Sequence, residues 1–225
     1  MIINGVWTWS KAMDTSDNGA VSKYLNEVSR YYGFAGFDRA HIVNINWIYN
    51  LPKVSQYWSN KLTRQVFDNW QLTGITSFVS GAPLGVALTT TDAADLTGSP
   101  TEAARTDIAG NAVIPKSQRG ESRFFNTAAF ARPAKGTLGN AGKYSVRGPG
   151  INNWDMGLYK NLYLKERYRF QLRWEAYDAL NHTQFNGVDT SALFNPSGVQ
   201  TNARFGHLIS AANPRRMQLA LKFYF

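Results

Sequence analysis

The chain has 225 residues and a formal net charge of +9, with 44% hydrophobic, 14% aromatic and 17% charged residues. It is too apolar for a disordered polymer, and the absence of cysteine excludes disulfides, thiolate metal sites and cysteine nucleophiles. No stretch has the ~20 predominantly apolar residues of a transmembrane helix. The basic balance suits an anionic partner such as nucleic acid or lipid phosphate, or else solvated side chains.

Apolar and polar residues alternate with a period of two in several segments, which predicts β-strands. Six long strands are expected near residues 2–12, 39–50, 69–80, 153–164, 168–179 and 215–225. The fifth is the clearest, because Phe170, Leu172 and Trp174 alternate with Gln171 and Arg173. In the third, both faces are mixed, so the face that meets lipid stays open.

The lengths of these strands and of their connections favour a membrane protein. Each predicted strand has 11 or 12 residues, whereas strands of soluble domains have about 5–6 and tilted transmembrane strands roughly 9–11. The connections 13–38, 81–152 and 180–214 are long and polar, while 51–68 is shorter and 165–167 is a tight turn. Long loops at one end and short turns at the other are typical of outer-membrane barrels. The predicted fold class is therefore all-β, a segment of an antiparallel up-and-down transmembrane β-barrel.

The polar face of the fifth strand is predicted to line the barrel interior. The lumen-facing candidates are Arg169, Gln171, Arg173 and Glu175. These residues could contact a plug or an anionic substrate. Alternatively, they form a hydrated wall in which opposite charges pair across strands. Lys160 falls on an apolar face, where its long side chain is expected to reach toward the membrane edge.

Aromatic residues on the apolar faces are candidates for the girdles at the two membrane interfaces. These are Trp7, Trp9, Trp47, Trp154, Tyr168 and Trp174. The alternative, carbohydrate stacking, requires them to face inward or to lie in loops.

Nothing in the chain indicates catalysis or a cofactor. The three histidines lack ligand spacing, no nucleophile motif or phosphate loop is present, and a calcium site at Asp92, Asp95 and Asp107 is an open alternative without EF-hand spacing. Nucleic-acid binding is disfavoured, because basic and aromatic residues fall on opposite faces of the clearest strand. Weak helical patterns occur only at 21–28 and 122–131, and no separate domain is expected within the loops.

An ordered series of motifs resembles the C-terminal barrel of TonB-dependent outer-membrane receptors. The motifs are DNWQLTGI at 68–75, SGAP at 80–83, FNTAAF at 125–130, LGNAG at 138–142, RGPG at 147–150, NWD at 153–155, EAYDALNH at 175–182, FG at 205–206 and PR at 214–215. Together they cover nearly the whole chain and are most similar to the Oar-like subgroup, which carries an N-terminal carboxypeptidase-regulatory-like domain.

The resemblance implies a 22-stranded barrel, an N-terminal plug, and a TonB box that couples uptake to the proton-motive force. Residues 1–225 are then expected to be the C-terminal part of the barrel, with the plug and the other strands absent, in the outer membrane of a Gram-negative bacterium. The implied partners are outer-membrane lipid, TonB through the missing N-terminal part, and an imported substrate that the sequence does not identify. No enzymatic activity is expected.

The last predicted strand resembles the C-terminal signal that the barrel-assembly machinery reads. The residues concerned are Leu221, Phe223 and Phe225. They also fit a lipid-facing strand without any recognition role. The alternative function for the whole chain is a soluble all-β binding module for glycans or anionic polymers, in which the apolar faces would pack against each other.

Overall fold

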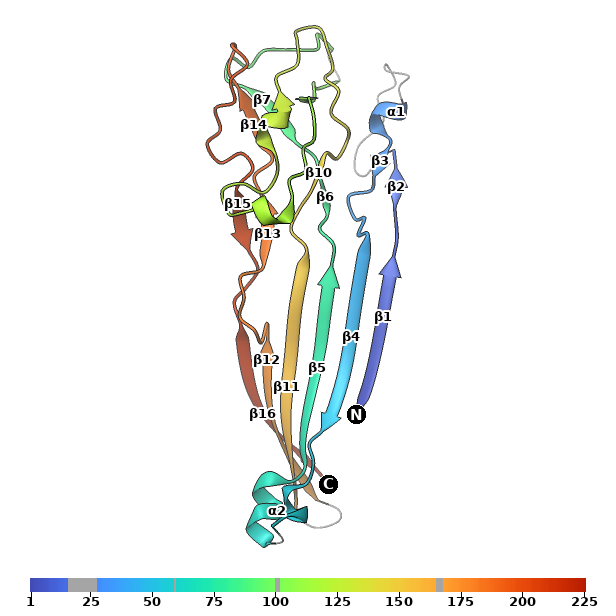
Figure 1. Cartoon of the computed structure of the whole chain (residues 1–225), viewed down its shortest axis with the longest axis vertical. Coiled ribbons are helices and arrows are strands. Elements are labelled where there is room, and N and C mark those ends of the chain that lie inside the picture. The colour runs from blue at the N-terminus through green and yellow to red at the C-terminus, as the bar shows by residue number, and fades with distance from the viewer. Residues whose placement is uncertain (16–27, 59, 100–101, 165–167) are drawn as a thin grey trace.

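The computed structural model describes residues 1–15, 28–58, 60–99, 102–164 and 168–225. Its main element is a tall antiparallel sheet in the order β1-β4-β5-β11-β12-β16 (Figure 1). The strands are β1 (Ile2–Trp9), β4 (His41–Asn50), β5 (Trp70–Val79), β11 (Ile151–Tyr163), β12 (Arg169–Tyr177) and β16 (Arg216–Tyr224). Each pairs with its predecessor and its successor in this series, so the predicted antiparallel up-and-down fold class is confirmed.

The observed strands differ from the predicted ones in length. They have 8, 10, 10, 13, 9 and 9 residues rather than 11 or 12. The strand predicted at 2–12 ends at Trp9, and beyond it the Ala12 amide donates to the Asp38 carboxylate at 2.7 Å instead of to a neighbouring strand. Pairing between strands resumes as β2 (Met13–Asp14) with β3 (Gly33–Phe34).

The register assigns every strand residue to one of two faces, because directly paired residues share a face. One row of paired residues runs through Tyr49, Leu72, Leu158, Trp174 and Leu219. The adjacent row runs through Asn50, Gln71, Tyr159, Arg173 and Ala220. One face is therefore apolar and the other polar, and the ambiguous strand 69–80 turns Trp70, Leu72 and Phe78 to the apolar face.

The apolar face is open to its surroundings. Leu219 and Leu221 are 73% and 65% exposed, whereas Gln171 on the polar face is 6% exposed. A soluble sandwich would bury the leucines, and their exposure is the arrangement of a sheet that faces lipid. The soluble alternative is therefore not favoured, and we call this apolar surface the lipid face.

The long connections gather at one end of the sheet (Figure 1). The described parts of residues 81–150 and 178–214 form what we call the loop body, with short strands and two 3-10 helices. These elements are β6 (Pro83–Leu84), β7 (Ala87–Thr90), β8 (Asp107–Ile108), η2 (Lys116–Gln118), η3 (Thr127–Ala129), β9 (Phe130–Ala131), β10 (Val146–Arg147), β13 (Phe185–Val188), β14 (Ser191–Phe194) and β15 (Leu208–Ala211). Strands β7 and β14 pair in parallel, which joins the two long connections.

The loop body has an apolar core of its own, which the sequence analysis did not anticipate. The rings of Phe125, Phe130 and Phe205 pack edge to face, with centroids 5.3 to 5.8 Å apart. Phe194 and Ala192 are fully buried beside them. The weak helical pattern at 122–131 corresponds to the short 3-10 turn η3. The pattern at 21–28 lies outside the described residues except for Val28, where α1 (Val28–Tyr31) begins.

At the other end, the connection 51–68 is structured rather than an irregular loop. It contains η1 (Val54–Gln56) and α2 (Lys61–Phe67), whose N-cap Asn60 accepts a hydrogen bond from the Thr63 amide. Asp68 follows α2, and the hydroxyl and amide of Ser55 donate to its carboxylate at 2.5 and 3.0 Å. These hydrogen bonds lower the pKa of Asp68. In the described part of the chain, no helix is long and apolar enough to cross a membrane.

Candidate functional site

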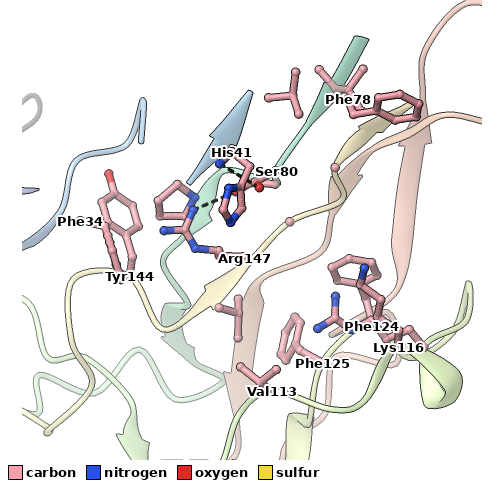
Figure 2. Close-up of a pocket in the computed structure, with 18 of the residues that line it drawn as sticks. Phe34, His41, Phe78, Ser80, Val113, Lys116, Phe124, Phe125, Tyr144 and Arg147 are labelled. Atoms are coloured by element: carbon pink, nitrogen blue, oxygen red, sulfur yellow. Dashed lines mark hydrogen bonds between the residues drawn. The ribbon is translucent and has the colours of Figure 1, made fainter. Parts of the chain in front are cut away.

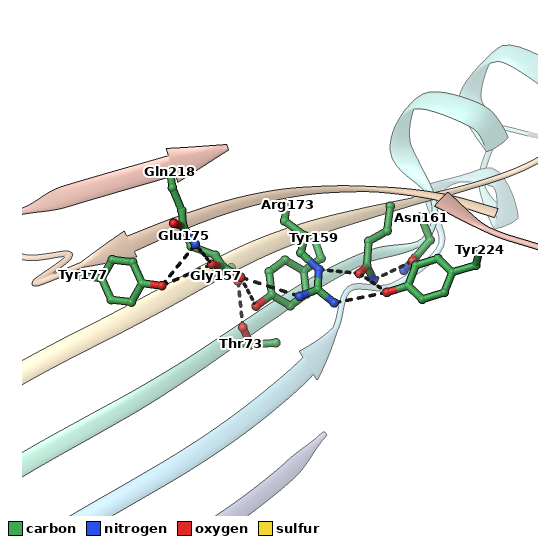
Figure 3. Close-up of polar contacts among 10 residues, drawn as sticks. Thr73, Gly157, Tyr159, Asn161, Arg173, Glu175, Tyr177, Gln218 and Tyr224 are labelled. Carbon is green, nitrogen blue, oxygen red and sulfur yellow. Dashed lines mark hydrogen bonds and ion pairs between the residues drawn. The ribbon is translucent and has the colours of Figure 1, made fainter. Parts of the chain in front are cut away.

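The polar face of β11, β12 and β16 carries a continuous hydrogen-bond network (Figure 3). Glu175 accepts hydrogen bonds from the Tyr159 hydroxyl at 2.9 Å, from the Gln218 side-chain amide and from the Tyr177 hydroxyl at 3.5 Å. The Tyr159 ring lies above Gly157, where a β-carbon would be 3.0 Å from the ring and its hydroxyl. The glycine thus leaves the space in which Tyr159 reaches the next strand.

The network continues through Arg173. Its Nε donates to the Gln171 side-chain oxygen at 2.6 Å, and Gln171 donates in turn to Asn161 at 2.9 Å. The Arg173 guanidinium also lies 4.8 Å from the centre of the Tyr159 ring and 4.0 Å from the Glu175 carboxylate. Both charges are therefore partnered within the wall.

The four candidates from the sequence all lie on this one polar face. Arg169 stacks over the Tyr224 ring at 4.1 Å, and the other three belong to the network. A groove of about 580 Å³ crosses the same surface, with Thr73, Tyr159, Arg173 and Glu175 among its lining residues. Because the charges are satisfied internally, the geometry favours a hydrated wall over a charged binding site. Their orientation toward a barrel lumen stays a prediction.

A larger pocket of about 700 Å³ lies where β4, β5 and β11 meet the loop body (Figure 2). Five aromatic residues contribute to its lining: Phe34, Phe78, Phe124, Phe125 and Tyr144. Lys116, Arg119 and Arg147 also line it, and no Asp or Glu does, among the residues that the structure describes. Apolar walls and unbalanced positive charge suit a ligand that has an anionic group and an apolar body.

The three cations differ in how they are held. Arg147 donates to the buried Asp38 carboxylate at 2.5 Å and lies 4.6 Å from the centre of the Phe34 ring. Arg119 donates to the Ile114 carbonyl at 3.2 Å. Lys116 is exposed, and its ammonium has no partner within the described ranges. Lys116 is thus the cation most available to a ligand.

Asp38 fixes Arg147 at the edge of this pocket. Burial raises the pKa of Asp38, but the hydrogen bonds from the Ala12 amide and Arg147 outweigh it, so the pKa is lowered. The carboxylate is therefore charged near neutral pH and holds the guanidinium in place.

Close backbone packing shapes the pocket floor. A β-carbon at Gly81 would be 1.8 Å from the Gly148 carbonyl oxygen, so the two chain segments can approach this closely only because residue 81 has no side chain. These glycines belong to the SGAP and RGPG motifs, which meet where Pro83 of β6 pairs with Arg147 of β10. The two motifs marked these segments in the sequence. The pocket itself was not predicted, because its lining comes from four distant segments and the alternation along a single strand does not report on their packing.

The six interfacial aromatic candidates all lie on or beside the lipid face. Trp7 and Trp9 are near the loop end of β1, and Trp154 is near the loop end of β11. Tyr168 precedes β12 at the opposite end, and its ring stacks on Phe223 at 5.9 Å. Two further candidates, Trp47 and Trp174, lie in mid-strand. A girdle role stays a prediction for all six.

Lys160 lies on the lipid face, as expected, but does not reach water. It is 5% exposed, lies 5.4 Å from the centre of the Trp70 ring and donates to the Asp68 carbonyl. The polar partner of the Lys160 ammonium is therefore a backbone oxygen of the protein, rather than water or headgroups at the edge of the membrane.

Leu221, Phe223 and Phe225 form an exposed row at the end of β16. Leu221 and Phe223 pair with Leu172 and Phe170 on the lipid face. Phe225 is 85% exposed and stacks on Phe223 at 5.8 Å. Recognition of this row by assembly machinery stays a prediction.

The three acidic residues considered as a calcium site have protein partners. Asp92 pairs with Arg132 at 3.0 Å, Asp95 accepts from the Gly98 amide at 2.9 Å, and Asp107 accepts from the Asn140 amide at 3.0 Å. Within the described ranges, no group of three or more His, Asp or Glu side chains is placed to hold a metal ion.

A meandering sheet with one lipid face, one polar face and long loops at a single end defines the class of the molecule, a membrane-embedded β-barrel protein. The match to a family model agrees: residues 2–218 match the outer membrane beta barrel domain. The chain therefore belongs to this family, and its location is the outer membrane. Comparison with curated proteins and with solved structures gave no match.

Proposed function

We propose that the chain is the C-terminal part of the barrel of a TonB-dependent outer-membrane receptor that imports a substrate. The observation that carries the proposal is the pocket of about 700 Å³ between the sheet and the loop body. In a barrel, the long-loop end faces the cell exterior, so this pocket would be open to solutes outside the cell. The motif series that resembles TonB-dependent receptors supports the coupling to TonB.

In this function the described residues hold and orient a substrate and perform no chemistry on it. Lys116 and Arg119 would attract an anionic group such as a carboxylate or phosphate. The rings of Phe124 and Phe125 would contact an apolar or aromatic body. The polar wall around Glu175 and Arg173 would then give the released substrate a hydrated surface below.

The test compares three strains of the bacterium that carries the gene. One lacks the gene, one lacks TonB, and one carries Lys116→Glu with Arg119→Glu. Growth is measured on a panel of single nutrient sources, including organic acids and phosphorylated compounds. We expect at least one source on which all three strains fail.

The matched control is Lys135→Glu, a charge reversal in the loop body outside the pocket. It should grow like the parent, and an immunoblot of outer-membrane fractions should show parental amounts of both variants. If the gene deletion grows normally on every source that the TonB-deficient strain cannot use, the proposal fails.

A further inference from the structure

The short connection at the end opposite the loop body exposes an unusual amount of apolar surface. Tyr57 and Trp58 are 78% and 70% exposed, and Leu62 on α2 is 71% exposed. Val66 and Phe67 on the same helix are also exposed. A patch of this kind, next to polar residues, marks an interaction surface rather than a random set of surface residues.

The helix is amphipathic despite its seven residues. Leu62 and Val66 are four residues apart and share one side, while Lys61 and Gln65 share another. Thr63 is buried against the connection. The protein therefore covers only part of the apolar side of α2, and Leu62, at 71% exposed, lies at its open edge.

Two contacts place the C-terminal end of α2 beside the lipid face. The Trp70 indole nitrogen donates to the Val66 carbonyl at 2.9 Å, and the Lys160 ammonium donates to the Asp68 carbonyl. Trp70 and Lys160 are paired residues of β5 and β11, and they lie in the rows of the lipid face. Helix α2 thus lies at the foot of the sheet, with its C-terminal end beside the lipid face (Figure 1).

The exposed charged residues of this connection are all positive. Lys53, Lys61 and Arg64 are exposed cations. The only carboxylate between residues 51 and 69 is Asp68, which is 2% exposed and engaged by Ser55. Phosphate-bearing lipid headgroups complement such a surface.

We propose that residues 53–58 and 60–67 form an interfacial anchor, which inserts its apolar side chains into the periplasmic leaflet and binds anionic phospholipid headgroups through Lys53, Lys61 and Arg64. An amphipathic helix with cations on its polar side and apolar residues opposite lies in the plane of a membrane interface. Short turns face the periplasm in outer-membrane barrels, which selects that leaflet. The anchor does not depend on which substrate the barrel imports.

The insertion is tested by spin labelling, which the cysteine-free chain makes simple. The full protein carries a single cysteine, Leu62→Cys or Gln65→Cys, and is reconstituted in vesicles of phosphatidylethanolamine and phosphatidylglycerol at 3:1. We expect the label at 62 to collide more often with oxygen, which concentrates in lipid, than with a water-soluble nickel chelate. The label at 65, on the polar side, should show the reverse. A label at 62 that meets the nickel chelate as often as the label at 65 overturns the proposal.

The headgroup contact is tested with spin-labelled lipids around the same protein. The association of phosphatidylglycerol relative to phosphatidylcholine should fall by about threefold to tenfold when Lys53, Lys61 and Arg64 are all changed to Gln, since each cation near a surface contributes separately. The control Lys222→Gln, on the polar face of β16, should leave the ratio unchanged. An unchanged ratio in the triple variant overturns the proposal. All four positions are exposed, so each variant retains the fold.

Discussion

The indole of Trp47 occupies the space above Gly74 on the neighbouring strand. A β-carbon at position 74 would lie 2.3 Å from Cζ2 of Trp47 and 2.4 Å from its Cε2. The two residues are directly paired across β4 and β5 on the lipid face. The glycine therefore lets the largest side chain of the row lie flat against the sheet.

The variant Gly74→Ala should destabilise the protein by about 1–3 kcal/mol, because the indole has to leave its position or the strands have to separate. The measurement is urea unfolding in lipid vesicles, followed by tryptophan fluorescence. Gly5→Ala is the matched control, since a β-carbon at this lipid-face position of β1 meets nothing within 4 Å. Equal urea midpoints for Gly74→Ala and Gly5→Ala would show that the close approach of Trp47 to residue 74 does not affect stability.

The ion pair between Asp38 and Arg147 predicts a pH dependence of stability. Because the pKa of Asp38 is lowered in the folded protein, the stabilisation is complete above the unfolded value of about 3.9 and is lost as the pH falls through the folded value. The difference in unfolding free energy between the parent and Asp38→Asn should therefore shrink below about pH 4. Unfolding midpoints at pH 7, 4 and 3 measure this.

The control for this series is Glu121→Gln, which changes an exposed carboxylate of the loop body. Arg147→Met should cost about 3 kcal/mol at pH 7, since it leaves the Asp38 carboxylate buried without its cation. A difference between the parent and Asp38→Asn that stays constant from pH 7 to 3 would contradict the assigned role of Asp38.

The sheet was predictable because lipid on one side and polar surroundings on the other impose strong alternation on each strand. The strand with Gly74 and Thr76 was ambiguous, since small residues fill the spaces under Trp47 and Trp154 and carry no apolar signal. Only the register with β4 and β11 resolves it. Helix α2 was missed because seven residues are too few for a clear helical period.

The loop body and its pocket were not predictable from alternation at all. Its core residues, such as Phe125, Phe194 and Phe205, are far apart in the sequence, so their packing is a tertiary property. The lining of the pocket likewise comes from distant segments. Lys116 lies in the loop body, where no alternation of polar and apolar residues predicts which way a side chain faces. The glycine-containing motifs SGAP and RGPG were the one sequence feature that pointed to this region, because the backbone at Gly81 closely approaches that at Gly148.

The wall network gives a third prediction, at Tyr159. Tyr159→Phe keeps the ring over Gly157 and against Arg173 but removes the hydrogen bond to Glu175. The expected loss is about 0.5–1.5 kcal/mol of unfolding free energy. Tyr163→Phe, on the same face of β11, is the control, because its hydroxyl has no hydrogen-bond partner within the described residues. Similar losses for both variants would mean that the network adds nothing to the sheet.

The last prediction separates assembly from stability at Phe225. The side chain is 85% exposed and its ring stacks on that of Phe223, so Phe225→Ala should change the unfolding free energy by less than about 0.5 kcal/mol. If the assembly machinery reads this residue, the amount of protein in the outer membrane should nevertheless fall severalfold, as quantitative immunoblots of membrane fractions would show. Leu219→Ala, also strongly exposed on β16 but outside the proposed signal, should leave that amount near the parental level. If Phe225→Ala is also inserted at the parental level, β16 is a lipid-facing strand without a recognition role at its last residue.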